Sequence, residues 1–438
     1  MVPRAVSRPP ILLSSLLLTA AACAGNGVQS TPTSIPPEAP PATSPPPSST
    51  TTVAPATTST TAAPSTTAAT TTSTAPPTTT TTTAPATTTA AGPRVITIAA
   101  AGDVLIHRAL ANVAAAHSPE GEDYDFVPLM SAVEPWVAAA DLAICHMEGT
   151  LSPDNTGLLY QDGFKHPARF NAPREVADAL VAVGWDACST ASNHATDRGS
   201  DGIADTLHVL DLVGLGHSGT ARNEEERGPA FYEVKGVTIG HLSYTFGLNS
   251  SRAGDRPWEV NVMDQEAILA DAAVARSAGA DFVILSLHWG IEYTVTPSQA
   301  QQDQAQRLLA SPDLDLILGH HAHVVQPIDW IDGEVVVYGM GNHLSNIRGL
   351  PDGRSVGGED GVIVEITITE QEDGTFAATG VRFTPTWVHH SEKAVLPVAD
   401  TLISGDPALA GVLQASWNRT LERLLAFEPI EVFPTAVP

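Results

Sequence analysis

The sequence predicts an α/β fold for residues 94–400, preceded by a long segment that cannot form a core. Three observations lead to this prediction. Short apolar runs alternate with longer amphipathic segments, almost every apolar run ends in Asp, Glu, Asn or His, and residues 24–93 contain almost no bulky apolar side chains. Strands that alternate with helices are typical of a mostly parallel sheet. Ligands of open α/β sheets bind beyond the carboxyl ends of the strands, so the polar strand ends indicate a site.

Residues 1–23 have the pattern of a signal peptide. Arg4 and Arg8 precede an apolar run over residues 11–22, which is short for a permanent membrane span. The run ends in small residues before Cys23, as in a lipoprotein processing site, although Ala20 stands where leucine is commonest. We therefore predict an exported protein at the cell surface, held on the outer side of the cell membrane by a lipid on Cys23. Ordinary cleavage and release is the alternative.

Residues 24–93 are predicted to be a disordered linker of Ser, Thr, Pro and Ala, with Glu38 as the single charged residue. Such a composition cannot bury enough apolar surface to fold. As a flexible coil the segment would span about 45 Å root-mean-square. This reach suits a tether that lifts a folded domain away from a membrane.

Charge and cysteine content narrow the possible partners. The net charge is −27, from 48 acidic and 21 basic residues, and an acidic chain repels phosphate backbones, so we expect no nucleic-acid partner. Three cysteines are too few for a disulfide scaffold. With Cys23 lipidated, Cys145 and Cys188 either pair in an oxidising compartment or remain separate small buried residues. We favour separate buried residues.

Six apolar runs are predicted strands, and polar residues follow each of them. Runs of this length without alternation are typical of strands buried on both faces. The runs and the residues that follow them are 94–101 before Asp103, 141–145 before His146 and Glu148, 185–190 before Asn193 and His194, 281–287 before His288, 314–318 before His320, His321 and His323, and 335–338 before Asn342 and His343.

Helical periodicity fills the intervals between these strands, at residues 173–183, 199–213, 264–278 and 298–309. Residues 361–369 and 375–384 are predicted antiparallel strands. Residues 401–438 form a C-terminal helix and tail, in which an amphipathic helix over residues 406–427 is expected to pack on the domain.

The residues at the strand ends are suited to metal binding. Carboxylate, amide oxygen and imidazole are ligands for divalent cations such as Zn, Mn or Fe. His321 and His323 stand at positions i and i+2, so in an extended chain both side chains would point the same way. We therefore predict one or two divalent metal ions at this edge, their identity open among Mn, Zn and Fe.

Five motifs also carry a family resemblance: Gly-Asp at 102–103, His-Met-Glu at 146–148, Ser-Asn-His-Ala-Thr-Asp at 192–197, Leu-His-Trp-Gly-Ile-Glu at 287–292 and Gly-His-His-Ala-His-Val-Val-Gln-Pro at 319–327. In this order they resemble the CapA-like poly-γ-glutamate capsule biosynthesis family, which is similar to the calcineurin-like metallophosphoesterases. The resemblance covers residues 96–346. It implies a four-layer α/β/β/α sandwich with a two-metal centre.

The resemblance also implies roles for individual residues. Glu148 occupies the place of a bridging aspartate, and Asp197 orients His194, the implied general acid. His107, His146, His320 and Asn342 are predicted to bind substrate. The implied metal ligands are Asp103, Glu148, Asn193, His288, His321 and His323.

The sequence departs from the expected patterns at three places. The phosphoesterases carry Asp-x-His at the first strand, whereas His107 follows Asp103 at i+4. CapA-like proteins usually carry Asn-Leu-Glu where this chain has His-Met-Glu at 146–148, and Gly-Asn-Phe where it has Gly-Asn-His at 341–343. The additional histidines either add ligands or have no special role.

Three functions are consistent with these residues. The first is a metal-dependent, phosphoesterase-like hydrolase or transferase that acts outside the membrane on an ester, amide or phosphate of an anionic polymer such as poly-γ-glutamate. The second is a non-catalytic accessory of a membrane synthase complex that makes, exports or anchors the polymer. The third is a ligand-binding surface lipoprotein with a structural metal.

Overall fold

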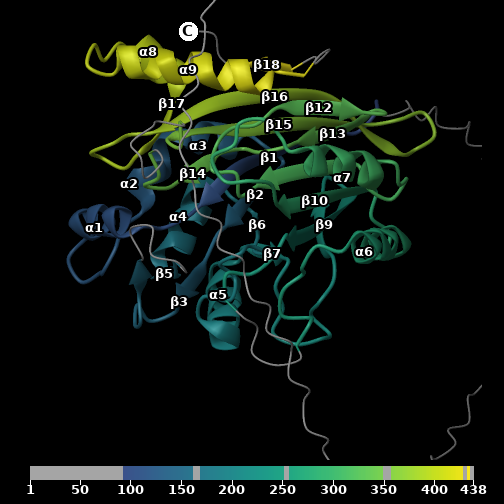
Figure 1. Ribbon diagram of the computed structural model, residues 1–438, viewed down its shortest axis with the longest axis horizontal. Helices are drawn as coiled ribbons and strands as arrows, with labels where there is room; N and C mark the ends of the chain where they lie inside the picture. The colour runs from purple at the N-terminus through teal and green to yellow at the C-terminus, as the bar shows by residue number, and fades with distance from the viewer. Residues whose placement is uncertain (1–91, 161–167, 251–255, 349–356, 428–431, 435–438) are drawn as a thin grey trace, which may run out of the picture. The chain divides into compact units, whose positions relative to one another are not determined.

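Two β-sheets that pack face to face form the centre of the domain (Figure 1). The computed structural model describes residues 92–160, 168–250, 256–348, 357–427 and 432–434. The predicted signal peptide, Cys23 and nearly all of the predicted linker lie outside these ranges. Within them, no helix is both long and apolar enough to cross a bilayer.

The first sheet has a parallel half and an antiparallel half, which meet at β1 (Val95–Val104). On one side of β1 lie parallel strands, and on the other side a long antiparallel meander begins. The short strand β14 pairs with the last residues of β1 in parallel. The other strands are β2 (Leu142–Met147), β6 (Ala187–Ser189), β7 (Gly216–Ser218), β14 (Asn342–Leu344), β15 (Asp360–Glu370), β16 (Phe376–Val388), β17 (Val395–Pro397) and β18 (Val432–Pro434).

The second sheet has a parallel centre and one antiparallel strand at each edge. Its order is β12 (Ile328–Ile331), β13 (Glu334–Val337), β11 (Leu316–His320), β10 (Phe282–His288), β9 (Val237–Thr245) and β8 (Ala230–Val234). A small third sheet contains β3 (Thr150–Ser152), β5 (Phe170–Pro173) and β4 (Leu159–Tyr160).

Side-chain alternation along the strands explains the layers. On β1, Ile96 and Ile98 enter the core between the two sheets, whereas Ala99 and Ala101 face the helices outside. On β10, Ile284 enters the inter-sheet core, and its neighbours face the opposite layer. Because both faces of these strands are buried, the strands are continuously apolar in sequence.

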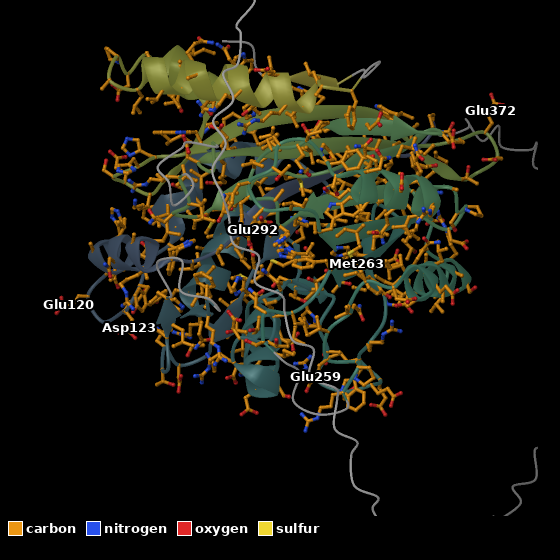
Figure 2. The ribbon with its side chains drawn as sticks, viewed as in Figure 1. Glu120, Asp123, Glu259, Met263, Glu292 and Glu372 are labelled. Carbon is orange, nitrogen blue, oxygen red and sulfur yellow. A yellow bond between two sulfur atoms is a disulfide. The ribbon has the colours of Figure 1, made fainter. Side chains whose placement is uncertain are left out.

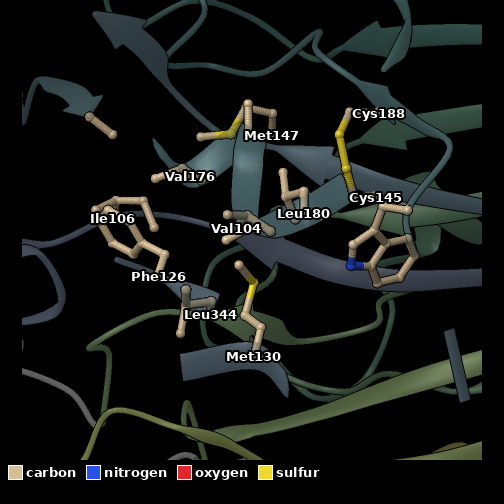
Figure 3. Packing of buried hydrophobic residues seen from close by; sticks show 14 of the residues in the cluster. Val104, Ile106, Phe126, Met130, Cys145, Met147, Val176, Leu180, Cys188 and Leu344 are labelled. Atoms are coloured by element: carbon tan, nitrogen blue, oxygen red, sulfur yellow. A yellow bond between two sulfur atoms is a disulfide. The ribbon is translucent and has the colours of Figure 1, made fainter. Parts of the chain in front are cut away.

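Helices cover the outer face of each sheet, as the clusters of buried residues there show. This arrangement confirms the predicted α/β/β/α layers. Figure 3 shows part of the core under the first sheet, where Val104 of β1 lies beside Leu180 of the helical layer and Leu344 of β14 belongs to the same cluster. The helices on the first sheet are α1 (Arg108–His117), α2 (Val127–Met130), η1 (Ser131–Val133), α3 (Glu134–Val137), α4 (Glu175–Val183) and α5 (Gly199–Val213), and those on the second are α6 (Gln265–Ser277) and α7 (Gln299–Leu309).

The C-terminal helices pack on the antiparallel half of the first sheet. Helix α8 (Val398–Ser404) and helix α9 (Ala410–Leu424) lie beside β16, at the top of Figure 1. Trp387 of β16 and Trp417 of α9 share one buried cluster. The amphipathic helix predicted over residues 406–427 is therefore confirmed as α9, and it packs on the domain.

Two sequence interpretations need correction. The alternation of strands and helices, taken alone, suggested one mostly parallel sheet. Two sheets form instead, as the family resemblance implied, with β10, β11 and β13 in the second sheet. Cys145 and Cys188 are not separate: they are register partners on β2 and β6, and a disulfide joins them (Figure 3).

Candidate metal centre

The carboxyl ends of strands from both sheets meet at one place and form the candidate site. In the first sheet, Asp103 on β1 is paired in register with Asn342 on β14 and with His146 on β2. In the second sheet, His288 on β10 is paired with His320 on β11. The ring of His146 stacks on that of His320 with 4.0 Å between centroids. The polar strand ends of the first sheet therefore contact those of the second sheet.

One group of candidate ligands consists of Asp103, His146 and His288, each of which offers a ligand atom within 4.8 Å of the others. All three side chains are buried. The Nδ1 atom of His146 lies 2.7 Å from Ser189 Oγ, and its Nε2 atom lies 3.0 Å from His288 Nδ1. The Nε2 atom of His288 lies 3.0 Å from Asn193 Oδ1, so the predicted ligand Asn193 adjoins this group.

A second group consists of Glu148, His321 and His323, again with ligand atoms within 4.8 Å of one another. His323 connects the two groups, because its Nδ1 atom lies 3.1 Å from Asp103 Oδ2 and its Nε2 atom lies 3.7 Å from Glu148 Oε1. The structure therefore brings together all six side chains that were predicted as metal ligands. It also places His146, which was predicted to bind substrate, among the candidate ligands.

The carboxylate of Glu148 tests whether these residues fit a metal ion. Both of its oxygens are buried, and neither has a hydrogen-bond partner among the described residues. Burial raises the pKa of Glu148 well above its usual range. A buried carboxylate without donors is costly, and a bound cation removes that cost. Since imidazole and carboxylate are also the preferred ligands of Zn, Mn and Fe, the residues fit a divalent metal.

Three imidazoles of the site are held neutral. Burial, with the neighbouring His320, lowers the pKa of His146 well below its usual value. Burial, with the neighbouring His321, does the same to the pKa of His288, and burial lowers the pKa of His321 to about 3. A neutral imidazole keeps a lone pair for a metal, so these side chains are ready to coordinate without losing a proton.

Asp103 and His323 form the charged part of the site. Burial alone would raise the pKa of Asp103, but hydrogen bonds from His320 and His323 hold it well below its usual range. Burial opposes a charged His323, but Glu148 and Asp103 in their ionised forms outweigh burial and raise its pKa to about 10, so His323 and Glu148 compete for one proton. A metal that binds both side chains displaces this proton.

The loop that carries His321 and His323 is a turn rather than an extended segment. Both residues have left-handed backbones, with φ of 80° and 53°, so the predicted extended geometry is wrong although both rings reach the site. The backbone N–H of Tyr293 donates to Ala322 O at 2.7 Å and holds the turn. Non-glycine residues in this conformation cost on the order of 1–3 kcal/mol each, and such strain is typical of functional sites.

His194 and Asp197 form a buried pair beside Asn193. The Nδ1 atom of His194 lies 2.7 Å from Asp197 Oδ2, and the same oxygen accepts a hydrogen bond from Phe170 N at 2.6 Å. The Phe170 ring lies edge-on to His194 at 4.8 Å. With Nδ1–H bonded to Asp197, the Nε2 atom of His194, which lies 3.3 Å from Asn249 Nδ2, is the nitrogen able to exchange a proton with a bound group.

The other residues predicted to bind substrate lie in different positions. His107 lies at the rim, edge-on to Phe170 at 5.3 Å, with its Nδ1 atom 3.3 Å from Asn346 N. The Nδ1 atom of His320 lies 3.4 Å from Asp103 Oδ1. The Asn342 amide lies 3.0 Å from His323 Nδ1 and donates to the carbonyls of His323 and Gly358, an arrangement that favours positioning of the His323 loop.

Three supporting residues were not predicted: Ser189, Phe170 and Asn249. Ser189 is the last residue of β6, so its place at the carboxyl end of a strand was the available signal. Phe170 belongs to the small sheet and Asn249 to a loop after β9, and neither has a local pattern that indicates a site.

His343, which stands where the family usually has phenylalanine, lies outside the two ligand groups. It is buried, both ring nitrogens lack a partner among the described residues, and Trp185 lies edge-on to its ring at 5.3 Å. Burial lowers the pKa of His343 to about 4. The folded protein therefore keeps this ring neutral while the unfolded chain protonates it near pH 6.5.

We expect a His343→Phe variant to resist acid better than the unaltered protein. Above about pH 6.5 His343 is neutral in both the folded and the unfolded protein, so its protonation costs no stability. As the pH falls from about 6.5 to 4, the unfolded chain binds a proton that the folded protein does not, and the free energy of unfolding falls by about 3 kcal/mol. Urea unfolding at several pH values measures this difference. A His343→Leu variant serves if phenylalanine overpacks the site, and equal acid sensitivity in all three proteins would contradict the interpretation.

The acidic charge of the protein is spread over its surface rather than gathered at the site. In Figure 2, Glu120 and Asp123 lie together at one edge of the domain and Glu372 lies at another, whereas Glu259 is buried. Glu292 follows β10, and its charge adds to the effect of burial on the pKa of Glu148. The site itself combines carboxylates with many histidines and is not simply an acidic patch.

The fold and the site define a class: a four-layer α/β/β/α protein with a buried, histidine-rich candidate metal centre at the carboxyl ends of both sheets. The family follows from comparison with known proteins. The chain belongs to the family described as bacterial capsule synthesis protein PGA_cap, whose model matches residues 97–347. The predicted family resemblance is thereby confirmed.

Relatives of similar sequence agree with this membership. The chain is 27% identical to "PGA biosynthesis protein CapA" of Bacillus subtilis over 66% of this chain and 71% of that protein. It is 25% identical to a "Probable polyglutamine synthesis accessory protein" of Mycobacterium tuberculosis over 54% of this chain and 63% of that protein. The calcineurin-like phosphoesterase YfkN of Bacillus subtilis aligns with a TM-score of 0.41 and 16% identity over 75% of this chain and 98% of that chain.

Proposed function

We propose that this protein is a metal-dependent hydrolase of capsule biosynthesis that acts outside the membrane on an anionic polymer of the poly-γ-glutamate type. The observation that carries the proposal is the meeting of two three-residue ligand groups, from two sheets, beside the His194–Asp197 pair. The names of two relatives, which refer to PGA biosynthesis and capsule biosynthesis, support the polymer as substrate class.

The groups that would hold metal are those already described: Asp103, His146 and His288 in one group and Glu148, His321 and His323 in the other, with Asn193 beside the first. When bound, divalent ions would supply Lewis-acid polarisation of a substrate oxygen and lower the pKa of a water.

The residues of this chain have separate tasks in such a reaction. His194 donates a proton from Nε2 to the leaving group, while Asp197 holds Nδ1 and stabilises the charged ring. Phe170 fixes both partners, through its backbone N–H to Asp197 and its ring against His194. The product of this chemistry is a cleaved ester, amide or phosphate bond in the polymer.

Location at the membrane is part of the proposal. The signal-peptide pattern and Cys23 support export and a lipid anchor on the outer side of the membrane, with residues 24–93 as the tether. An exported protein would also meet an oxidising compartment, where the disulfide between Cys145 and Cys188 is stable.

A second candidate function is a non-catalytic accessory of a membrane synthase complex, which the name of the Mycobacterium tuberculosis relative supports. In that case the ligand groups would serve structure or polymer binding. The two functions differ in whether the protein turns over a substrate.

Elemental analysis and activity assays test the proposal on the same preparation. We expect one or two equivalents of Mn, Zn or Fe after reconstitution and desalting, and metal-dependent cleavage of a phosphodiester or γ-glutamyl substrate. Metal without turnover on any of these substrates would favour the accessory or a structural metal. No metal after reconstitution would overturn the hydrolase.

A further inference from the structure

A cation-lined pocket of about 260 Å³ lies apart from the ligand groups, between the segment that follows β14 and the turn that joins β16 to β17. Neither segment belongs to the five motifs that carry the family resemblance. The side chains that matter here are Asn346, Arg348, Glu359, His389, His390 and Lys393.

Two cations in this pocket share the same neutral acceptors. Lys393 is only 7% exposed, and its Nζ atom donates to Asn346 Oδ1 at 2.7 Å and to His390 O at 2.5 Å. Arg348 reaches the same two oxygens at 3.4 Å and 3.3 Å and also contacts His390 Nε2. The two positive charges are therefore close neighbours.

No carboxylate of the described residues neutralises this pair at ion-pair distance. Glu359 lines the pocket, but its Oε1 atom lies 3.6 Å from Arg419 on α9. Burial, with the charge of Arg348, lowers the pKa of Lys393. Glu359 acts on Arg348 only from beyond ion-pair distance. Two neighbouring cations in a partly buried pocket repel each other, and an anionic ligand between them would stabilise both.

The pocket is connected to the candidate metal centre by short contacts. Asn346 N lies 3.3 Å from His107 Nδ1, and the His107 ring lies against Phe170, whose ring in turn lies against His194. Asn346 also comes four residues after Asn342, which contacts His323. Four residues span at most about 14 Å, so a polymer that occupies the metal centre can reach the pocket with a nearby unit.

We propose that this pocket binds a carboxylate of the acidic polymer, one or a few units away from the bond at the metal centre. This inference rests on the proposed function for the choice of polymer. Arg348 supplies the exposed guanidinium and Lys393 the buried ammonium, and together they recognise a side-chain or terminal carboxylate. The chain as a whole carries a net charge of −27, so a pocket with two cations offers an anionic polymer a local attraction.

Binding of a fluorescent oligo-γ-glutamate to the full chain, followed by anisotropy at fixed ionic strength, tests the pocket. We expect an Arg348→Gln/Lys393→Met variant to raise Kd by about 10- to 100-fold, because it removes two charge-assisted hydrogen bonds. The matched control is Lys235→Met/Arg382→Gln. Lys235 has a left-handed backbone like Lys393, with φ of 51° and 60° respectively, and both control cations pair with carboxylates.

Several outcomes decide between the possibilities. Equal Kd values for the two double variants would overturn the pocket. Loss of inorganic phosphate binding with unchanged oligo-γ-glutamate binding would also overturn it, because the pocket would then be a phosphate site. Arg348→Gln alone, which changes an exposed side chain, repeats the test if the double variant does not fold.

The pocket and the proposed function can fail separately. If the protein turns over a substrate, the pocket variant should raise KM with little change in kcat or metal content. If it binds the oligomer through this pocket but never cleaves any substrate, the hydrolase is wrong and the pocket is supported. If it cleaves substrate with the same KM in both variants, the hydrolase is supported and the pocket is overturned.

Discussion

An Asp103→Ala/His323→Ala variant is expected to retain less than about a tenth of the metal bound by the unaltered protein, since even partners of ligands change metal affinity by 10–100-fold. The reason lies in the geometry: the variant removes one member from each ligand group and the 3.1 Å contact that connects them. Glu148, which has no donors among the described residues, would then have neither His323 nor a metal beside it. Elemental analysis after reconstitution with Mn or Zn and desalting measures the loss.

The matched control for this variant is Asp211→Ala/His217→Ala. These residues form an Asp–His pair with 3.0 Å between His217 Nε2 and Asp211 Oδ1, at a half-exposed position on α5 and β7. The control variant therefore removes the same residue types, one Asp and one His, and leaves both ligand groups intact. Thermal unfolding of the metal-free proteins shows whether the site variant is folded. Equal metal content in both variants would contradict the metal centre.

The strands that carry the site were predictable because they are buried on both faces. Residues 282–285 are apolar without interruption, since alternate side chains enter the inter-sheet core and the core under α6 and α7. The apolar run ends where the chain reaches the edge of the sheet, so His288 at that point could be recognised as a site residue. This local rule applies to any strand with two buried faces.

The division into two sheets followed from the family resemblance and could not be predicted from the apolar runs themselves. A parallel strand has the same sequence pattern in either sheet. Nothing in residues 281–287 indicates that this strand pairs with β9 and β11. The strands β8 and β9, which complete the second sheet, mix polar and apolar residues and were not predicted. The pairing of Cys145 with Cys188 depends on the register between β2 and β6, which is likewise a tertiary property.

The sequence predicted which residues form the site better than it predicted how the backbone places them. His321 and His323 were expected to face one metal from an extended chain, whereas a left-handed turn brings them there. The turn depends on contacts with Tyr293 and β14, both distant in sequence. The pocket of Arg348 and Lys393 is assembled from two such distant segments, which is why no motif indicates it.

Replacing His194 with alanine is expected to lower kcat by about 10²- to 10⁴-fold on any substrate that supports turnover, with the metal content unchanged. His194 is 6% exposed, its Nδ1–H is held by Asp197, and its Nε2 atom, beside Asn249, is the nitrogen left to exchange a proton. It belongs to neither ligand group. Loss of the side chain should therefore remove proton donation to the leaving group without removing metal.

An Asp197→Asn variant tests the role of Asp197 in positioning the general acid His194. The amide can still hold the ring but no longer stabilises its charged form, so kcat should fall less than in His194→Ala and the pH dependence of kcat should change. A substrate with a good leaving group, such as an aryl phosphodiester, gives a further test, because it needs little proton donation and should be cleaved by His194→Ala at close to the normal rate. If His194→Ala lost activity equally on good and poor leaving groups, or lost metal, His194 would not be a general acid and would instead support the metal centre.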